Sequence, residues 1–567
     1  MAVEKLIVEH IDTWTTALQT RSTAGRGSSG KIDLYGIKKL RELILELAVR
    51  GKLVPQDPND EPASALLERI AVEKAELVKQ GKIKKPKPLP EISEEEKPFE
   101  LPEGWEWVRF GNIFKVSSGD ALTSNQMNTL GEYPVYGGNG INGYHDSYNV
   151  AKRTLVIGRV GYYCGSIHIT PNHAWVTDNA FITHFSESNF DLDYVEILLK
   201  ATNLKEDESA TAQPVISGRK IYPIVLAVPP LEEQRKIAKK THELLGLCTR
   251  LEQHSLTGLD AHQQLVETLL TTLTDSQNAE ELAENWARIS EHFDTLFTTE
   301  ASIDALKQTI LQLAVMGKLV PQDPNDEPAS ELLKRIAQEK AQLVKDGKIK
   351  KQKPLPPISD EEKPFELPEG WEWCRIGNFS ISTEYGLSHK TFISDIGVPV
   401  FKMGDIQNGK VTIGNQQVVD NSIEELPFLY LEYDDILYNR TNSADLVGKT
   451  GIFKGENNIF SFASYLIRIR TIKVDAIPDF LNLNMQVPLF RKYQIMPYVK
   501  QQCGQANVNG TIMKNMLVAI APQKEQQRII DKLSEFIDLL EMIKIRTKNS
   551  QQTQLQLADA LTDAAIN

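Results

Sequence analysis

The sequence predicts an α/β protein in which two mixed α/β domains are joined by long antiparallel helices, with an internal duplication in a pseudo-twofold, cyclic order. Three observations predict this fold. One segment occurs twice almost unchanged, a coiled-coil-like stripe comes after each copy at a matching place, and strand-like segments with glycine-rich loops lie in between. A chain of 567 residues has room for several domains.

The duplicated segment runs from Gly51 to Trp107 and again from Gly317 to Trp373. The first copy begins GKLVPQDPNDEPASALLERI and the second begins GKLVPQDPNDEPASELLKRI; the two align without a gap at a period of 266 residues. This period is far longer than any solenoid unit. It therefore indicates two copies of a domain-scale module.

A helical stripe precedes each copy, because apolar residues recur there at a 3-4-3 spacing. Each stripe stops before a glycine, Gly51 or Gly317, with a proline shortly beyond, which predicts that both helices end there. The stripe residues are Ile37, Leu40, Ile44 and Leu47 in the first copy and Ile303, Leu306, Ile310 and Leu313 in the second.

A second helical stripe starts after PPLEEQRKI, from Pro229, and after APQKEQQRI, from Ala521. Both resemble coiled-coil seams that begin after a proline, and each continues for about 40 residues, or roughly 60 Å of straight helix. An ordinary bundle helix is the alternative for either one alone, but matching places favour long paired helices. We expect partner proteins to dock on these stripes, at Ile237, Leu244, Leu251, Ile529, Leu533, Phe536 and Leu540.

The order of the segments is that of a circle that is cut once. The last residues of the chain, QTQLQLADALTDAAIN, resemble AHQQLVETLLTTLTDSQN at 261–278. The residues that follow this central segment correspond to the start of the protein. The expected parts are N-terminal helices 1–50, a first repeat 51–107, a first variable domain 108–228, central helices 229–316, a second repeat 317–373, a second variable domain 374–520 and a C-terminal helix 521–567.

Bulk properties exclude several classes. The net charge of −13 is opposite in sign to that of a bare nucleic-acid binder, so any DNA contact requires locally focused basic groups or a partner. No stretch has the length of a membrane span, and the N-terminus lacks a signal-peptide core. The four cysteines form no CxxC pair, which argues against zinc or a disulfide framework and fits a reducing cytoplasm; they are Cys164, Cys248, Cys374 and Cys503.

The stretch YGGNGINGY contains a GxGxxG pattern at Gly138, Gly140 and Gly143. A dinucleotide loop would come after a buried strand and open a helix, but here a short segment broken by Pro134 precedes it and no helical stripe comes next. A glycine-rich hairpin is favoured. A loop whose backbone lies close to a large ligand is the third interpretation.

The sequence closely resembles the specificity (S) subunits of Type I restriction-modification enzymes. In the first variable region the resemblance rests on EYPVYGGNGINGYHDSY, LVIGRVGYYCGSIHI and AWVTDNAFI. In the second it rests on VPVFKMGDIQNG, DDILYNRTNSADLVGKTGIF and GQANVNGTIMKNMLVAIAPQKEQQRI. PPLEEQRKI and APQKEQQRI look like the family's closing signature for each target-recognition domain. The likeness covers nearly the whole chain.

The resemblance implies a chain without a catalytic site or cofactor of its own. Each target-recognition domain would read one half of a split, asymmetric site in double-stranded DNA. The long helices would set the spacing and bind two methyltransferase (M) subunits, which hold S-adenosylmethionine. Two translocating and cleaving (R) subunits, which use ATP and Mg²⁺, would join them.

Two rival functions lack the sequence features that they require. An enzyme with fused recognition would need an Asn-Pro-Pro-aromatic or Asp-Pro-Pro-aromatic tetrapeptide or a Walker A loop, and none is present. A decoy would expose a continuous acidic surface instead of Asn- and Gly-rich loops. The carboxylate runs EISEEEKPFE and ISDEEKPFE indicate solvated linker rather than a metal site. GKIKKPKPLP and GKIKKQKPLP indicate extended linker, with phosphate contact as the alternative.

Candidate DNA contacts are chosen by side-chain chemistry, since Asn suits adenine edges and Arg suits guanine or phosphate. For each residue alone, a structural role in its loop stays an open alternative. In the first variable region the candidates are Gly138, Asn139, Gly140, Asn142, Tyr144, Arg159, Asn179, Ser217, Arg219 and Lys220. In the second they are Tyr385, Lys402, Asp405, Asn439, Arg440, Asn442, Lys449, Gln505 and Asn507.

Overall fold

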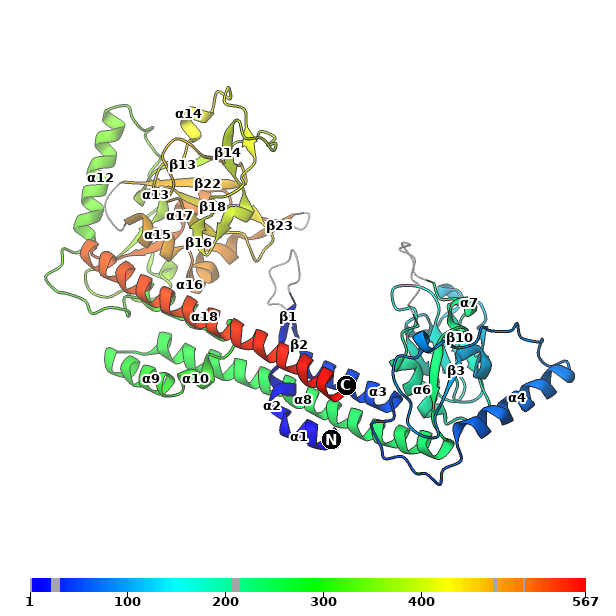
Figure 1. Ribbon diagram of the computed structural model, residues 1–567. Coiled ribbons are helices and arrows are strands. Elements are labelled where there is room, and N and C mark those ends of the chain that lie inside the picture. The colour runs from blue at the N-terminus through cyan, green and yellow to red at the C-terminus, as the bar shows by residue number, and fades with distance from the viewer. Residues whose placement is uncertain (1–2, 22–30, 205–214, 473–476, 503–504, 567) are drawn as a thin grey trace. The chain divides into compact units, whose positions relative to one another are not determined.

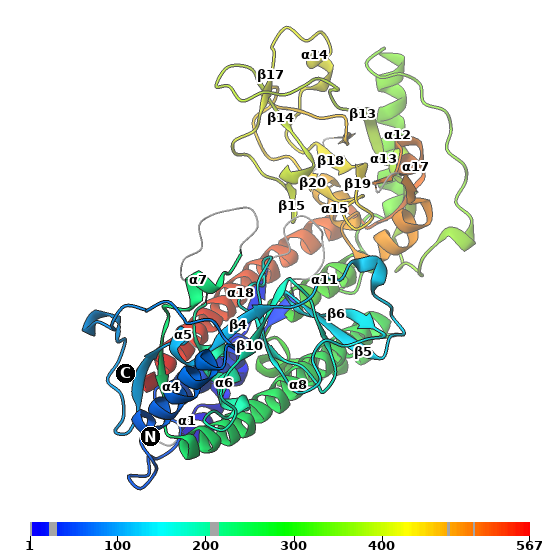
Figure 2. The same cartoon turned by 90° about the vertical axis from the view of Figure 1, so that its right-hand side faces the viewer.

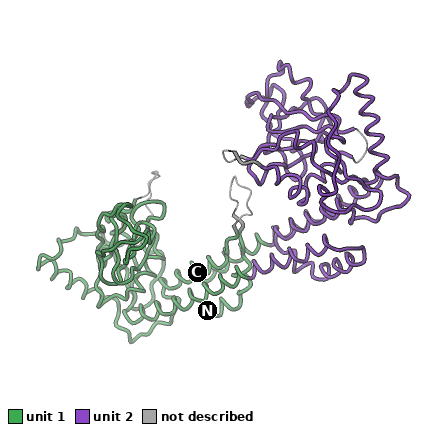
Figure 3. The backbone as a smooth tube through the Cα atoms, turned by 180° about the vertical axis from the view of Figure 1, so that it is seen from behind, with its two compact units in different colours: residues 1–19, 32–257, 551–567 green, residues 20–31, 258–550 purple. Residues whose placement is uncertain are grey.

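The computed structural model describes residues 3–21, 31–204, 215–472, 477–502 and 505–566. They form two compact units (Figure 3). Unit 1 comprises 1–19, 32–257 and 551–567, and unit 2 comprises 20–31 and 258–550. The prediction of two long helices is confirmed: α8 (Leu231–Asp275) has 45 residues and α18 (Gln523–Ile566) has 44. Each of these helices contributes one part to each unit.

Unit 1 contains a mixed α/β domain between α4 and α8 (Figure 1). A four-stranded sheet has the order β4-β10-β7-β8, and a three-stranded sheet has the order β6-β5-β9. The bounds are α1 Val3–Glu9, α2 Ile11–Thr16, α3 Tyr35–Val49, α4 Ala63–Lys79, β3 Glu106–Arg109, α5 Phe110–Ile113, β4 Lys115–Ser118, β5 Tyr133–Gly137, β6 Gly140–His145, β7 Leu155–Gly158, β8 Ile167–Ile169, β9 Trp175–Val176, β10 Ala180–His184, α6 Leu192–Ala201, α7 Gly218–Ile221 and β11 Val225–Val228. The short strands β1 (Gln19–Arg21) and β2 (Lys31–Asp33) pair with each other.

Unit 2 also contains a mixed α/β domain, with a larger main sheet (Figure 2). This sheet has the order β13-β22-β18-β20-β16-β15, and β17-β14-β21 and β19-β24-β23 form two smaller sheets. The bounds are α9 Ala279–Glu291, α10 Phe293–Leu296, α11 Glu300–Val315, α12 Ala329–Lys345, β12 Glu372–Arg375, α13 Ile376–Phe379, β13 Ser380–Tyr385, β14 Val398–Phe401, β15 Ile406–Gln407, β16 Gly409–Val411, β17 Val418–Val419, α14 Leu426–Leu429, β18 Ile436–Asn439, β19 Thr441–Asn442, β20 Thr450–Ile452, β21 Ser461–Phe462, β22 Leu466–Thr471, α15 Ile477–Asn484, α16 Pro488–Phe490, β23 Lys500–Gln502, β24 Gln505–Asn507, α17 Gly510–Asn515 and β25 Leu517–Ile520.

The two ends of each mixed domain are held together by a two-stranded ribbon. β3 pairs antiparallel with β11 in unit 1, and β12 pairs in the same way with β25 in unit 2. Each domain is thus an insertion whose first and last strands lie side by side, directly before a long helix.

One buried carboxylate joins three distant segments in each unit. Glu233, near the start of α8, accepts hydrogen bonds from the Trp105 indole (2.9 Å) and from the Gln56 amide (3.1 Å). In unit 2, Glu525 accepts in the same way from Trp371 (3.1 Å) and Gln322 (3.2 Å). Burial raises the pKa of both carboxyls. The GWEW repeat and the EEQ and KEQ signatures therefore position the domain on its helix.

A lysine caps the end of a long helix in each unit, in support of the cyclic order. Lys318 donates from Nζ to the carbonyls of Thr274 and Ser276, at 2.8 Å each, where α8 ends. Its repeat counterpart, Lys52, donates to the carbonyl of Ile566 at 2.5 Å, at the end of α18. An ammonium group satisfies orphan carbonyls and complements the negative end of a helix.

The predicted helix ends at Gly51 and Gly317 are confirmed, because these glycines have φ of 68° and 69° after α3 and α11. This left-handed conformation favours glycine. All eight stripe residues of α3 and α11 are buried.

The carboxylate runs are not wholly solvated, which corrects the expectation of a plain linker. Glu96 pairs with the buried Arg109 guanidinium (2.7 Å), which also donates to the Pro90 and Glu91 carbonyls. The hydrogen bond from Arg109, with a second from the Ser93 backbone N–H, lowers the pKa of Glu96 to about 2. Glu362 pairs with Arg375 in the second copy (2.9 Å). Each proline-rich segment is therefore fastened to its domain.

Candidate DNA interface

The glycine-rich stretch is a tight hairpin, which confirms the favoured interpretation. Gly138 and Asn139 form the two-residue turn between β5 and β6, and Gly140 has φ of 87°. The dinucleotide interpretation is wrong, because the glycines lead into a strand and not into a helix. A Cβ at Gly138 would lie 2.3 Å from the carbonyl oxygen of Val160, so the hairpin tip packs against the segment after β7.

Arg159 comes directly after β7 and lies beside this tip. Its guanidinium is 5.3 Å from the Phe181 ring centroid and contacts the Asp178 carbonyl at 3.4 Å. Its backbone N–H donates to the Asn179 carbonyl (2.9 Å), and its carbonyl accepts from Ile216 N–H (2.9 Å). Its Nε is buried without a partner. The hairpin, the β9–β10 turn and the segment before α7 thus converge on one arginine.

Arg440 occupies the equivalent place after β18 in unit 2. Its backbone N–H donates to the Tyr465 carbonyl (3.0 Å), and its carbonyl accepts from Val508 N–H (2.9 Å). Arg159 makes the same two kinds of backbone hydrogen bond, and we call this pair of bonds the frame of the arginine. Its Nε donates to the Ser464 carbonyl (2.9 Å), and its guanidinium lies 4.9 Å from the Tyr385 ring centroid. The two domains hold an arginine on one frame among different neighbours.

The structure brings two second-region candidates, Tyr385 and Asn507, into contact with this arginine. Arg440 donates to the side-chain oxygen of the exposed Asn507 (3.3 Å), and the Tyr385 hydroxyl accepts from Gly510 N–H at 2.8 Å. Asn442 lies on β19, which pairs with β24, and its side-chain oxygen accepts from Ser443 N–H. Gln505 begins β24, but its side chain lies outside the described part of the chain.

Three of the other candidates in this region are engaged or buried within the domain, and Lys449 is exposed. Asn439 is 1 % exposed and its side-chain oxygen has no partner, which contradicts a contact with DNA. Asp405 accepts from the backbone N–H of Lys402 (2.6 Å) in a short turn, and Lys402 donates from Nζ to Gln417 (2.6 Å). Lys449 is exposed, and its carbonyl accepts from Asn439 N–H.

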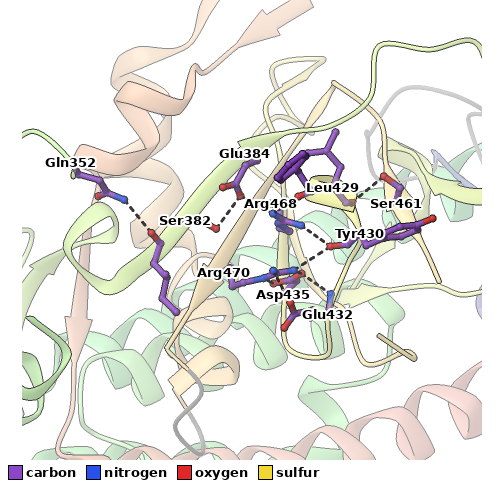
Figure 4. Close-up of polar contacts among 12 residues, drawn as sticks. Gln352, Ser382, Glu384, Leu429, Tyr430, Glu432, Asp435, Ser461, Arg468 and Arg470 are labelled. Carbon is purple, nitrogen blue, oxygen red and sulfur yellow. Dashed lines mark hydrogen bonds and ion pairs between the residues drawn. The ribbon is translucent and has the colours of Figure 1, made fainter. Parts of the chain in front are cut away.

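Two arginines of β22, which no sequence pattern singled out, also point inward (Figure 4). Arg468 donates to Glu384 (2.9 Å) and to the Tyr430 carbonyl (2.6 Å). Arg470 makes a two-pronged pair with Asp435 at 2.7 and 2.6 Å. These charges are neutralised internally and fasten the segment after α14, so they are not available to phosphate.

The remaining first-region candidates lie at the surface. Asn142 and Tyr144 are exposed on β6, and Asn179 is exposed in the β9–β10 turn. Ser217 precedes α7, whose Arg219 and Lys220 are exposed.

Sequence reasoning missed two further surface residues of this domain. Tyr162 and Tyr163 come shortly after Arg159 and are 81 % and 55 % exposed. The signal was present in RVGYYCG, where two adjacent tyrosines lie between glycines.

The predicted docking stripes are largely internal, which corrects the expectation that partners bind them. Because α8 and α18 pack against their own units, five of the seven residues are buried; they are Ile237, Leu244, Ile529, Leu533 and Leu540. Leu251 and Phe536 are half-buried. The exposed apolar residues of α18 in unit 2 are Leu539, Met542 and Ile545.

Within the described residues, no group of His, Cys, Asp and Glu side chains could hold a metal ion. Cys164, Cys248 and Cys374 are buried and form no disulfide, and Cys503 lies outside the described residues. None of the described helices combines the length and apolar character that crossing a membrane requires.

Comparison with known proteins gives the family. The model of the Type I restriction modification DNA specificity domain matches residues 102–261 and 368–551. The chain is 50 % identical to the EcoAI specificity subunit and 48 % identical to the EcoEI specificity subunit, both Type I restriction enzymes of Escherichia coli, over the full length of each chain. A solved HsdS subunit from Thermoanaerobacter tengcongensis matches with 15 % identity and a TM-score of 0.36, covering 83 % of this chain and 98 % of that one. The chain therefore belongs to the family of Type I restriction enzyme specificity subunits.

Proposed function

We propose that this chain reads DNA sequence for a Type I restriction-modification complex and has no catalytic activity of its own. Each mixed domain reads one half of a bipartite, asymmetric site. One observation carries the proposal: Arg159 and Arg440 occupy the same frame position in two domains whose surrounding side chains differ. A shared frame with different neighbours suits two readers of different half-sites.

The chemistry at each arginine favours direct readout. A guanidinium offers a planar fork of donors that matches guanine O6 and N7, and Asn matches adenine. The rings of Phe181 and Tyr385 lie within cation–π distance of the two guanidinium groups, which limits the rotamer entropy lost on binding. The side chain of Asn507 accepts from the fork of Arg440, and Asn179 bonds through its carbonyl to the backbone N–H of Arg159.

Partners complete the activity. Two M subunits would supply S-adenosylmethionine-dependent methylation of adenine, and two R subunits would supply translocation and cleavage with ATP and Mg²⁺. The long helices would set the distance between half-sites. The exposed apolar side chains of Leu539, Met542 and Ile545 support docking of an M subunit on α18, because monomeric surfaces rarely gather such groups on one helix face.

The test is a genome-wide map of methylated adenines in cells that carry this chain with its M subunits. We expect two short motifs separated by a spacer of unspecified sequence. A single continuous motif, or methylation without sequence preference, would refute bipartite reading.

A further inference from the structure

We infer that the two lysine-rich segments after α4 and α12 are sequence-independent clamps for the DNA backbone. The basic arm, as we define it, comprises residues 82–90 in unit 1 and 348–356 in unit 2. This inference rests on the proposed function and assigns a separate surface to it. The four lysines of each arm occupy equivalent places; they are Lys82, Lys84, Lys85 and Lys87, and Lys348, Lys350, Lys351 and Lys353.

All eight lysines are exposed, and none of these described side chains forms an ion pair with the chain. By contrast, the β22 arginines Arg468 and Arg470 are neutralised internally. Each arm thus concentrates four unpaired charges on a protein whose net charge is −13. This local focus is what a net acidic protein needs to approach a polyanion.

The unit 1 arm is held at both of its ends. Gly81 ends α4 with φ of 70°, and the N–H groups of Lys82 and Ile83 return to the Leu77 carbonyl. At the other end, Arg109 Nε donates to the Pro90 carbonyl at 3.1 Å. Figure 1 shows the segment after α4 returning to the strands of its own unit.

Unit 2 fixes its arm at the same two points. Gly347 has φ of 71°, Lys348 and Ile349 return to Leu343, and Arg375 Nε donates to the Pro356 carbonyl at 2.8 Å. Prolines between these anchors keep the backbone extended at about 3.1 Å per residue, close to the roughly 3.4 Å rise per phosphate of one DNA strand. A linear array of charges therefore faces solvent without the entropy of a loose tail.

The identity of the two arms points to the DNA backbone and not to bases. The variable domains differ because they read different half-sites, whereas the arms keep the same exposed lysines although packing does not require them. Phosphate presents the same chemistry at both half-sites. The unit 1 arm also ends near the candidate interface: a Cβ at Gly111 would lie 2.9 Å from Leu89, and Gly111 N–H donates to the carbonyl of Tyr222, next to α7.

The experiment measures the salt dependence of binding to a duplex of random sequence by the assembled complex with M subunits. The variant replaces the four lysines of one arm by Gln: K82Q, K84Q, K85Q and K87Q. The control makes the same charge change at exposed helix lysines elsewhere: K5Q, K38Q, K239Q and K548Q. The slope of log K against log salt is negative, and each lost phosphate contact reduces its magnitude by about 0.9. We therefore expect the magnitude to decrease by about 2 to 4 for the arm variant only.

Further outcomes separate the explanations. Replacement of the same lysines by Arg should restore the slope. A wild-type slope with loss of M subunits would show that the arm binds protein, and a wild-type slope with full assembly would show that it binds nothing; either result overturns the inference. Because the probe has random sequence, the change in slope can be measured even if the chain fails to discriminate its target sequence. Such a failure would contradict only the proposed function.

Discussion

The guanidinium of Arg440 lies 4.9 Å from the centroid of the Tyr385 ring and donates to the side chain of Asn507. This arrangement holds a half-buried guanidinium beside the exposed side chain of Asn507. We expect Arg440→Ala to relax specificity in one half-site by about 1–3 kcal/mol at one base pair and to leave the other half unchanged. Binding to a panel of single-base variants at two salt concentrations measures this.

The matched variant is Arg159→Ala, which should relax the opposite half-site. A loss that is uniform across the panel, with the salt slope reduced by about one, would reassign Arg440 to phosphate. No loss at all would make it a structural residue of the frame.

The ribbons β3–β11 and β12–β25 suggest that each domain is exchangeable. Replacing residues 108–228 by the corresponding domain of another family member should change one half of the methylated motif. Glu106, Trp107 and the hydrogen bonds of Glu233 are retained in this exchange. Methylation mapping reads both halves at once. If both halves change, the two domains do not read independently.

The exposed face of α18 gives a docking prediction. Leu539→Ser, Met542→Ser and Ile545→Ser together should reduce recovery of M subunits in a co-purification, because three desolvated apolar contacts are lost. The control is Leu244→Asp, which is buried and should impair folding of unit 1 instead. Circular dichroism separates the two effects, and full recovery of M with the triple variant would refute docking at this face.

Lys74 gives a pH prediction. Its half-buried ammonium donates to the carbonyls of Gly111 and Asn112, and desolvation lowers its pKa from 10.5 to about 8. The unfolded chain therefore binds more protons between these values, so this group favours folding increasingly as the pH rises through 8 toward 10.5. Relative to Lys74→Met, the wild type should gain roughly 1 kcal/mol between about pH 7.5 and 9.5.

Thermal midpoints of both proteins at the two pH values measure this gain. Lys340→Met should behave in the same direction, since burial also lowers the pKa of Lys340. Lys79→Met, at an exposed position, is the control. A constant difference between wild type and Lys74→Met across this range would show that Lys74 titrates normally.

Much of the scaffold was predictable because duplication repeats the pattern that specifies it. The stripes ending at Gly51 and Gly317, the length of α8 and α18, and the hairpin at Gly138 result from periodicity and glycine chemistry. The similar frames around Arg159 and Arg440 were not predictable, because the same backbone hydrogen bonds are made by segments whose sequences differ.

The docking stripes show why sequence alone failed elsewhere. Periodicity indicates that Ile237 and Leu244 face something apolar, but not whether that is the same chain or a partner. Asn439 likewise has a side chain suited to adenine, yet it ends a buried strand. The acidic run around Glu96 looked solvated, because its partner Arg109 is brought to it only by folding.

The hydroxyl of Tyr35 donates to Asp559, 524 residues later in the chain. At synthesis rates of about 5–20 residues per second, roughly 25 to 100 seconds separate the emergence of these two residues from the ribosome. During that interval α3 lacks the part of α18 that completes its surroundings. A nascent chain must therefore keep the apolar stripe of α3 from aggregating until the final helix arrives.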